Sequence, residues 1–548
     1  METTAYDPNN RGPAMRAAGL WMDETMDDFL ARHLQAFPDK QAVVGYRVDR
    51  AQPFRLSYRE LADRVNRAAA AMHRMGIGRG DVVSVQMPNW WEFAVLALAC
   101  GRVGAALNPL MPIFRERELG FMLDSAQSKL LVVPKTYRGF DHEAMARDLK
   151  AQLPGLRHIA VVDGEGPDGF EQSMQAGPAT QGIVVPEGAT PLAPDDLAGL
   201  MFTSGTTGSP KGVMHSSNTM MACMHALSTR FGIGADDVYL ASTPVGHTTG
   251  HVAVVLIGLR QGGTVVMQDL WDGRKGVDIM REEKVSYFAG STPFLNDVCD
   301  AVAEGRPAPT ALRIFLCGGA PIPPVLVEKA RDQVGITVCS LWGMTEVLSG
   351  TLTEPQRASQ KSASTDGRPL EGMDIRITDD DGREVPAGQA GRLKVRGAQM
   401  FLGYHRRPDI VAFDAEGWFD SGDLARQDDE GYIRICGRTK DVLIRGGENV
   451  PVVEIESLLL KHPAVQTAAI VGYPDARLGE RACAFVTLRP GHALSLQDVQ
   501  THMLQCKVAK QYWPERLEVL QAMPATPTGK VQKFRLRELA SAFSTPQA

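Results

Sequence analysis

The chain has 548 residues, which exceeds one ordinary hydrophobic core and predicts several domains packed together. Apolar residues make up 44% and charged residues 22%, as in ordinary globular proteins, and the formal net charge is −6. This balance contains no strongly basic block, so it argues against duplex nucleic acid as the main partner.

Eight cysteines are scattered singly, without a Cys-x-x-Cys pair, so we expect reduced thiols in a cytoplasmic protein. Residues 1–16 are polar, and we expect no signal peptide there. The chain has no stretch of about 18 uninterrupted apolar residues, so we also expect no transmembrane segment. Peripheral membrane contact and a homodimer both stay open at this point.

Between residue 56 and about residue 350, short β-branched runs alternate with helical periods. Helices are expected over Tyr58–Met75, Trp91–Ala99 and Asn218–Phe231. The alternation predicts an α/β body with largely parallel sheets. Its expected buried strands are Val82–Met87, Leu130–Val133, Ile159–Val162, Leu197–Phe202, Thr264–Met267 and Leu312–Leu316.

After residue 367 the pattern changes to strand, Asp-Gly turn, strand, which predicts a small antiparallel, β-barrel-like section. The last hundred or so residues read as a smaller α+β unit. We therefore expect a domain boundary near residue 438, with a large body over residues 1–438 and a separate, lid-like domain over residues 439–548. Expected lid elements are the strands Val465–Val471 and Ala482–Leu488 and the helix Leu496–Val508.

The loop Thr203–Gly212, "TSGTTGSPKG", combines hydroxyls, three glycines and a lysine. Glycine lets several backbone N–H groups converge on an oxyanion, so the loop predicts a phosphate site, with a flexible Gly/Ser turn as the alternative. A Walker A loop is excluded because Pro210 and Gly212 occupy two diagnostic positions. The loop follows an apolar strand and precedes a helix, where phosphate loops belong.

Five segments, in order, resemble the adenylate-forming superfamily of acyl-CoA synthetases, luciferases and peptide-synthetase adenylation domains. The resemblance covers nearly the whole chain, from residue 56 to residue 533. Its segments are the phosphate loop, "LCGGAP" (Leu316–Pro321), "LWGMTE" (Leu341–Glu346), "GWFDSGDLARQDDEGYIRICGRTKDVLIRGGENV" (Gly417–Val450) and "PATPTGKVQK" (Pro524–Lys533).

The resemblance implies roles in the first three segments. Lys211 would hold the β- and γ-phosphates, and its alternative is a solvated lysine. Glu346 would coordinate Mg²⁺, a hard ion that prefers carboxylate and phosphate oxygens. Thr345 would contact the α-phosphate. The implied ATP-binding residues of these segments are Thr203, Ser204, Gly205, Thr206, Thr207, Gly208, Gly318, Gly319, Ala320, Pro321, Trp342 and Gly343.

Trp342 stands where most of the family places tyrosine. Its indole would offer adenine an aromatic face but lacks the phenol hydroxyl, and a purely structural core tryptophan is the alternative. Asp423 would accept hydrogen bonds from both ribose hydroxyls, with a turn cap as the alternative. Arg438 would reach the ribose or a phosphate.

Lys530 is the main catalytic candidate, because the family's lysine here bridges the carboxylate and the α-phosphate. The alternative is an exposed lysine in a basic tail. Lys440 would be the hinge about which the lid rotates between half-reactions. Gly446 and Gly447 would let the pantetheine arm pass close to the backbone.

The acyl pocket is expected near "TPVGHTTG", with His247 as its gate; a packed or solvent-facing histidine is the alternative. Gly290, Ser291 and Met344 would line the same pocket. These segments carry no arginine for a second carboxylate, which favours an uncharged acyl group with some bulk.

Two positions depart from the family pattern. Pro451 directly follows Val450, so the geometry of the thiol tunnel would differ slightly. Arg392 stands where glutamate is usual.

The implied activity is an ATP-dependent, Mg²⁺-dependent acyl-CoA synthetase that forms an acyl-AMP and then a coenzyme A thioester. The pattern is most similar to cyclohexanecarboxylate–CoA ligases and to medium-chain or alicyclic acid ligases. Two alternatives stay open, an acyl-AMP ligase that loads a carrier protein and a non-catalytic nucleotide-binding regulator. We expect free coenzyme A because no carrier domain follows Lys533, and the intact Lys211, Glu346, Asp423 and Lys530 argue against a regulator.

Overall fold

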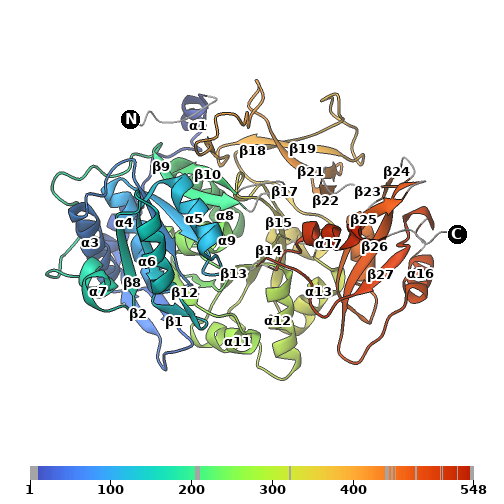
Figure 1. The fold of residues 1–548 in the computed structure, drawn as a ribbon, viewed down its shortest axis with the longest axis horizontal. Coiled ribbons are helices and arrows are strands. Elements are labelled where there is room, and N and C mark those ends of the chain that lie inside the picture. Colours follow the sequence, from blue (N-terminus) through green and yellow to red (C-terminus); the bar gives the residue numbers. More distant parts are fainter. Residues whose placement is uncertain are drawn as a thin grey trace.

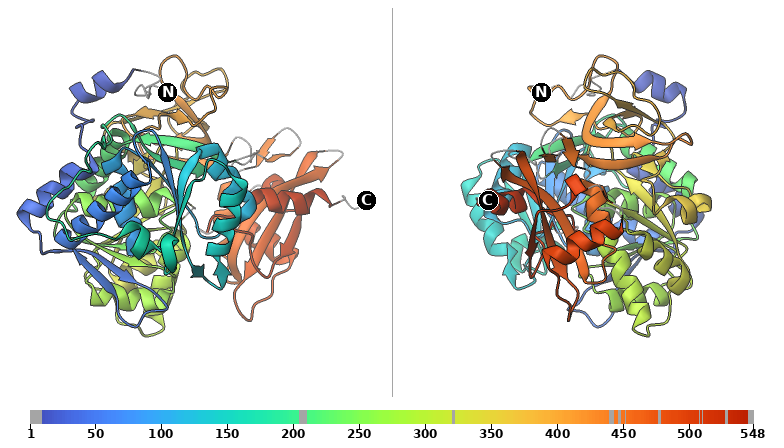
Figure 2. Two further views of the ribbon diagram at one scale, coloured as in Figure 1. Left: turned by 60° about the vertical axis from the view of Figure 1, so that its left-hand side comes forward. Right: turned by 90° about the vertical axis from the view of Figure 1, so that its right-hand side faces the viewer.

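The computed structural model places a large α/β body beside a smaller C-terminal domain (Figure 1). Figure 2 shows the C-terminal domain at one end of the body. The structure describes residues 10–203, 210–319, 322–438, 443–445, 448–450, 452–475, 478–506, 508, 510–526 and 529–543.

A nine-stranded sheet forms one half of the body. Its inner strands are parallel, and antiparallel pairs close both edges. In spatial order the strands are β17 (Arg368–Pro369), β16 (Thr351–Leu352), β15 (Thr337–Trp342), β14 (Ile314–Gly318), β13 (Tyr287–Gly290), β11 (Val238–Ala241), β12 (Thr264–Gln268), β1 (Gln41–Tyr46) and β2 (Phe54–Ser57).

A seven-stranded sheet forms the other half, again with a parallel centre. Its antiparallel edge contains the hairpin of β9 and β10 and the short strand β20. In spatial order the strands are β20 (Gly403–Tyr404), β10 (Lys211–Ser216), β9 (Leu197–Thr203), β4 (Ala106–Leu110), β3 (Val82–Gln86), β5 (Ser128–Pro134) and β8 (His158–Val162). β6 (Thr136–Tyr137) and β7 (Phe140–Asp141) form a separate hairpin.

Helices fill three layers around these sheets. The largest core cluster joins both sheets through α3 (Tyr58–Arg74), α4 (Trp91–Val103) and α8 (Ser217–Phe231). One outer layer contains α11 (Gly273–Glu282), α12 (Thr292–Ala303) and α13 (Pro324–Lys329), and the other contains α5 (Glu116–Ala126) and α6 (His142–Gln152). Because both faces of each sheet are covered, central strands such as β3 are buried at every residue.

The remaining helices of the body are short or peripheral. Two segments, η2 (His251–Leu256) and η3 (Ala330–Val334), have the wider turns of a π-helix, and η2 runs directly on from α9 (Thr248–Gly250). The others are α1 (Gly12–Ala17), α2 (Met26–Ala36), α7 (Phe170–Met174), α10 (Ile257–Arg260) and α14 (Ala358–Lys361), with the 3₁₀ turns Gly166–Asp168 and Pro355–Arg357.

The antiparallel section expected after residue 367 is a four-stranded sheet that packs on the body. Its order is β18 (Met373–Thr378), β19 (Gly391–Gly397), β21 (Phe419–Gln427) and β22 (Ile433–Arg438). An Asp-Gly turn joins the first two strands, as the sequence predicts, and Gly382 has the positive φ of 83° that this turn requires. The N-terminal arm lies along this sheet, where the Arg11 guanidinium donates to the carbonyl of Met400 at 2.6 Å.

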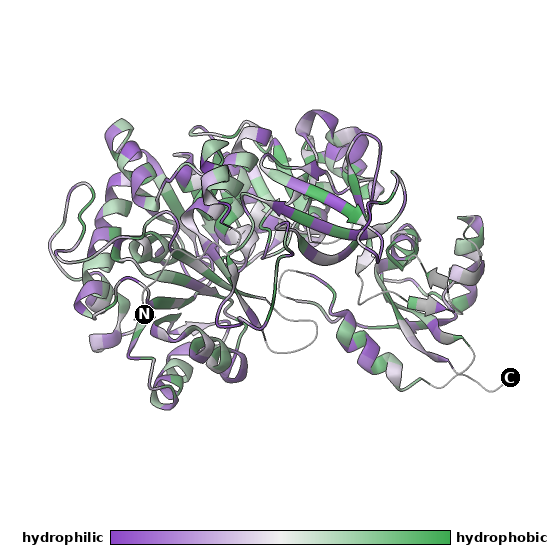
Figure 3. Cartoon of the chain, turned by 90° about the horizontal axis from the view of Figure 1, so that it is seen from above, coloured by the Kyte–Doolittle hydropathy of each residue, from purple (hydrophilic) through white to green (hydrophobic). Residues whose placement is uncertain are grey.

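The C-terminal domain is a five-stranded sheet with helices, matching the smaller α+β unit expected from the sequence. Figure 3 shows that its helices and strands carry both hydrophilic and hydrophobic residues. The elements are β23 (Leu443–Arg445), β24 (Glu448–Val450), α15 (Val452–Leu459), β25 (Val465–Asp475), β26 (Gly479–Leu488), α16 (Leu496–Gln505), the 3₁₀ turn Lys510–Tyr512, β27 (Arg516–Val519) and α17 (Lys533–Ser541).

Helix α8 follows shortly after the phosphate loop, as the sequence predicts. One element was not predicted: strand β10 lies between the loop and the helix, and Lys211 is its first residue. β10 pairs antiparallel with β9, so the loop closes a hairpin at the sheet edge. Among the described residues, no helix has the length and apolar character needed to cross a membrane.

Candidate active site

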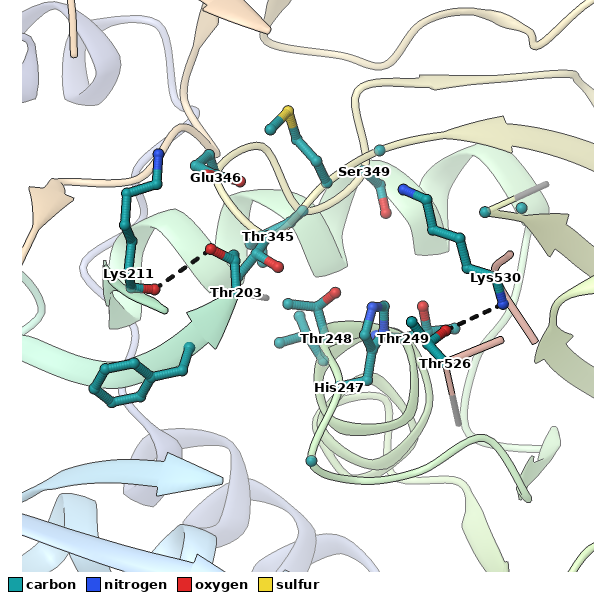
Figure 4. Close-up of a pocket in the computed structure, with 18 of the residues that line it drawn as sticks. Thr203, Lys211, His247, Thr248, Thr249, Thr345, Glu346, Ser349, Thr526 and Lys530 are labelled. Atoms are coloured by element: carbon teal, nitrogen blue, oxygen red, sulfur yellow. Dashed lines mark hydrogen bonds between the residues drawn. The ribbon is translucent and has the colours of Figure 1, made fainter. Parts of the chain in front are cut away.

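A cavity of about 770 Å³ lies where the body, the four-stranded sheet and the C-terminal domain meet. Figure 4 shows Lys211 and Glu346 on one side, Lys530 on the other, and His247 between them. The lining residues that the sequence also predicts are Thr203, Lys211, His247, Gly290, Ser291, Gly318, Gly319, Gly343, Met344, Thr345, Glu346 and Lys530. Residues from six separate stretches of sequence therefore meet in one cavity.

The two ends of the phosphate loop line the cavity. Thr203 ends β9 and Lys211 begins β10, and the two residues are paired directly across the hairpin. The Thr203 hydroxyl donates to the Lys211 carbonyl at 3.5 Å (Figure 4). The predicted residues Ser204, Gly205, Thr206, Thr207 and Gly208 lie outside the described residues.

Tyr404 joins Lys211 and Glu346. Its hydroxyl donates to Glu346 Oε1 at 2.9 Å, and the Lys211 ammonium lies 4.3 Å from the centre of its ring. Burial, and secondly the charge of Glu346, raise the pKa of Tyr404 well above its usual value, so the phenol stays a donor. The sequence reasoning missed Tyr404, because the stretch "FLGYHRRP" carries no pattern that marks a site.

The backbone of Thr345 is held by His215, a second residue that the sequence reasoning missed. His215 is fully buried in β10, and burial lowers its pKa to about 4, so the ring is neutral. Its Nε2–H donates to the Thr345 carbonyl at 2.8 Å, while Nδ1 accepts from the Thr219 hydroxyl at 3.1 Å. This contact fixes the turn that presents Thr345 and Glu346 to the cavity.

Trp342 and Asp423 meet behind the cavity wall. The indole Nε1–H donates to Asp423 Oδ2 at 2.8 Å, and the two residues are 7% and 4% exposed. Neither side chain is among those that line the cavity, although Gly343 and Gly422 beside them are. Arg438 ends β22 with its backbone paired opposite Asp423.

Small residues form the wall beside β14. Gly318 lies so close to β15 that a Cβ there would stand 2.9 Å from the Leu341 carbonyl oxygen. Gly319 follows with a φ of +84°, which favours glycine. Both glycines line the cavity, whereas the predicted neighbours Ala320 and Pro321 lie outside the described residues.

His247 stands at the start of α9 with its ring in the cavity wall (Figure 4). Its Nδ1 accepts the backbone N–H of Thr249 at 3.2 Å. Burial, and secondly the positive charge of Lys530, lower the pKa of His247 to about 4. At neutral pH the ring is therefore uncharged, which suits a wall group or gate better than a proton donor.

Lys530 enters the cavity from the C-terminal domain. A tight turn holds it: its backbone N–H donates to the Thr526 hydroxyl at 3.1 Å, and its carbonyl accepts from the Thr526 backbone at 2.7 Å. Gly529 has a φ of +81°, and a Cβ there would lie 3.0 Å from Pro293 Cγ of the body. The turn is thus docked on the body with Lys530 directed inward (Figure 4).

Lys440, Gly446 and Gly447 lie outside the described residues, as does Pro451. Arg392, the other departure noted in the sequence, lines the cavity and forms an ion pair with Asp420 at 2.7 Å.

One end of the cavity is apolar and lies between α8, η2 and the segment after β15. The Cys223 thiol there is buried beside Ser349, and burial raises its pKa to about 12, which makes it a small apolar wall group. The residues at this end are Cys223, Val252, Ala253, Leu341, Leu348 and Ser349. None of them carries a charge, so the lining suits an uncharged group.

The donor chemistry at Glu346 fits Mg²⁺. The carboxylate lines the cavity, and Tyr404 occupies one of its oxygens. Within the described residues no group of three His, Cys, Asp or Glu side chains could hold a metal alone. Mg²⁺ typically binds one or two carboxylates together with substrate phosphates, which a single glutamate beside a phosphate loop would provide.

Comparison with known proteins places this geometry in a family. The model of AMP-binding enzymes matches residues 30–405, and that of the AMP-binding enzyme C-terminal domain matches residues 454–530. A medium-chain fatty-acid–CoA ligase of Escherichia coli is 36% identical over 98% of this chain and 94% of its own. A salicyl-AMP ligase / salicyl-S-ArCP synthetase of Mycobacterium tuberculosis is 34% identical over 96% of this chain and 92% of its own.

Solved structures agree with these matches. The crystal structure of ATP-bound MatB from Rhodopseudomonas palustris superimposes with a TM-score of 0.83 at 27% identity, covering 95% of this chain and 99% of that one. The expected α/β fold with a smaller C-terminal domain is confirmed. The chain belongs to the AMP-binding enzyme family, the adenylate-forming ligases, and is an ATP-using acid–thiol ligase.

Proposed function

We propose that this ligase activates an uncharged medium-chain or alicyclic carboxylic acid, such as cyclohexanecarboxylate, and transfers the acyl group to coenzyme A. The observation that carries the proposal is one cavity with Lys211, Glu346 and Lys530 around an open centre and an uncharged apolar end. The similarity to a medium-chain fatty-acid–CoA ligase supports the same substrate class. Six buried cysteines among eight support the cytoplasm as its compartment.

In the first half-reaction, a carboxylate oxygen attacks the α-phosphorus of ATP and the bond to the β-phosphate breaks, releasing pyrophosphate. Both reactants are anions, so neutralising their charge is the main catalytic task. Lys530 would hold the carboxylate against the α-phosphate, with the hydroxyl of Thr345 beside it. Lys211 would neutralise the departing phosphates. Mg²⁺ held by Glu346 would supply further positive charge.

In the second half-reaction, the thiolate sulfur attacks the acyl carbon and AMP leaves with the original carboxylate oxygen. We place the domain division at residues 438 and 439 and the hinge at Lys440. Gly529 lies so close to the body that a Cβ there would stand 3.0 Å from Pro293 Cγ, and Lys530 beside it lines the cavity, which supports its role in the first half-reaction. A rotation of the lid would withdraw Lys530 and bring Gly446 and Gly447 to the site.

We assign each part of the nucleotide to a different group of residues at the cavity. Asp423 and Arg438 would bind the ribose, Trp342 and the Gly318–Gly319 wall would flank the adenine, and the loop from Thr203 would bind the phosphates. His247, Gly290, Ser291 and Met344 would surround the reacting end of the acid. Their small or neutral side chains offer the carboxylate no cation of their own, so we assign this role to Lys530, which lines the same cavity.

The test is pyrophosphate release by purified protein with ATP and Mg²⁺, supplied with octanoate, cyclohexanecarboxylate, benzoate, salicylate or succinate. Each acid is measured with and without coenzyme A. We expect octanoate or cyclohexanecarboxylate to turn over best, to need coenzyme A for turnover, and to give the thioester. Succinate, with its second charge, is expected to be a poor substrate. Adenylate formation without a thioester would instead indicate a carrier-protein acceptor, and no turnover with any acid would contradict the proposal.

A further inference from the structure

We propose that Tyr404 is a positioning residue that holds the phosphate-binding lysine and the metal-binding glutamate in one fixed arrangement before ATP binds. The inference rests on the proposed function, because it takes Lys211 and Glu346 as the groups that meet the phosphates and Mg²⁺. It adds a residue that the sequence motifs do not include.

The sheet places Tyr404 beside Lys211. β20 pairs antiparallel with β10, and Tyr404 lies opposite Val213, two residues after Lys211 on the same face. The register brings the Lys211 ammonium to 4.3 Å from the ring centre, within the range of a cation–π contact. The aromatic ring of Tyr404 therefore holds the Lys211 ammonium at the cavity wall.

The same side chain holds the glutamate. The Tyr404 hydroxyl donates to Glu346 Oε1 at 2.9 Å, and Glu346 is only 4% exposed. The Glu346 carbonyl also accepts the backbone N–H of Phe401 at 2.9 Å, so the backbone and the carboxylate are fixed from one segment. A carboxylate held by a hydrogen bond presents its remaining lone pairs to a ligand in a defined direction.

In the part of the chain that the structure describes, the two charges have no ionic partner of their own. Within the described residues, neither the Lys211 ammonium nor the Glu346 carboxylate forms an ion pair, although both line the cavity. Glu346 is buried, and buried charges normally pair with an opposite charge or bind a metal. Tyr404 therefore holds the positive Lys211 and the negative Glu346 in place for a ligand that contains both phosphates and a metal cation.

Tyr432 makes the same two kinds of contact, but the charged groups that it contacts have ionic partners. The Tyr432 hydroxyl donates to Glu354 Oε2 at 2.7 Å, and the Lys361 ammonium lies 4.5 Å from the ring centre. Here Glu354 has Arg230 as an ionic partner, at 3.7 Å, and Lys361 pairs with an aspartate and a glutamate. None of these residues lines the cavity, so this set is a matched structural control.

The experiment measures ATP binding by titration calorimetry, with Mg²⁺ and with EDTA in its place. Tyr404→Phe keeps the ring but loses the hydroxyl, so metal-free ATP should bind within about twofold of wild type. Its Mg·ATP affinity should fall about tenfold, as when a hydrogen-bond partner of a metal ligand is removed. Tyr404→Leu loses the ring as well and should also weaken metal-free ATP, by about threefold.

Tyr432→Phe should leave both affinities at the wild-type value, while its melting temperature reports the general cost of losing a buried tyrosine hydroxyl. Equal Mg·ATP affinity for Tyr404→Phe and wild type would overturn the inference and leave the proposed function standing. A wild-type protein that fails to bind ATP would instead overturn the proposed function. Loss of affinity in both tyrosine variants would show a general effect of stability and would also overturn the inference.

Discussion

The indole N–H of Trp342 donates to Asp423 Oδ2 at 2.8 Å, which ties the residue that replaces the family's usual tyrosine to the proposed ribose ligand. The ring has little room to move, because a Cβ at Gly350 would lie 2.5 Å from its Cζ3. The tryptophan therefore fixes one oxygen of a carboxylate that stands just behind the cavity wall.

Replacing Trp342 with phenylalanine should weaken ATP binding about tenfold, because hydrogen bonds to charged groups contribute about 1.5–3 kcal/mol. It should also lower the preference for ATP over 2′-deoxy-ATP, since the freed carboxylate can turn away from the ribose. Calorimetry with both nucleotides measures the two effects.

The control is Trp271→Phe. The Trp271 indole donates to Asp297 Oδ2 at the same 2.8 Å, and its ring packs against Gly276, yet none of these residues lines the cavity. An unchanged preference for ATP in Trp342→Phe, or an equal loss in the control, would refute the coupling to the ribose site.

Substituting Lys530 with glutamine should slow pyrophosphate release by at least a hundredfold, because the variant loses the cation between two anions. Thioester formation from chemically supplied acyl-AMP should stay within a few-fold of wild type, because that step does not need this lysine. Lys533→Gln is the control: Lys533 lies three residues on, pairs with Glu456 at 2.7 Å and does not line the cavity. Near-normal pyrophosphate release by Lys530→Gln would remove the lysine from the mechanism.

Filling the apolar end of the cavity should restrict the enzyme to shorter or less bulky acids. Cys223→Leu adds volume beside Val252 and Ala253, so kcat/KM for longer or bulkier acids should drop about tenfold while that for short acids is kept. Cys299→Leu enlarges another fully buried helical cysteine, outside the cavity, and controls for the ~1–3 kcal/mol cost of overpacking. A uniform loss for all acids in Cys223→Leu would mean that this end does not hold the acyl group.

Acid should destabilise the body through its buried neutral histidines. Burial lowers the pKa of His251 to about 3, and Phe93 packs against its ring. The unfolded chain binds a proton near pH 6.5 and the folded chain only near pH 3, so stability is complete above pH 6.5 and falls as the pH falls below it. At pH 5 this one histidine costs about 2 kcal/mol.

His251→Leu should therefore lose less thermal stability than wild type when both are moved from pH 7.5 to pH 5. His215 and His247, whose pKa values burial lowers to about 4, continue to titrate in both proteins. An identical drop in melting temperature for the two proteins would show that His251 does not titrate as its burial implies.

Short-range patterns allowed much of the fold to be predicted. The apolar runs that became β5, β9 and β12 end within two residues of the predicted bounds, because strands buried on both faces leave a continuous signal. Strand β10 was not predicted: its residues, "KGVMHS", are half polar, and only pairing with β9 and β20 makes it a strand. Tertiary pairing of this kind leaves no local pattern.

The residues of the site also fall into those that could be predicted from the sequence and those that could not. Lys211, Glu346 and Lys530 could be predicted because the family's motifs contain them, and the structure brings all three to one cavity. Tyr404 and His215 could not, because each acts through a contact between segments far apart in the chain: Tyr404 with Glu346, and His215 with Thr345. Such contacts depend on the sheet register, which the sequence of either segment alone does not contain.

The most direct test of the proposed mechanism traces one oxygen atom from the carboxylate of the acid to AMP. The acid that turns over best is labelled with ¹⁸O in its carboxylate and incubated with ATP, Mg²⁺ and coenzyme A, and the products are examined by mass spectrometry. Attack of the carboxylate on the α-phosphorus predicts one ¹⁸O in AMP and none in pyrophosphate. Unlabelled AMP, or ADP and phosphate as the products, would contradict an acyl-adenylate and with it the proposed activity.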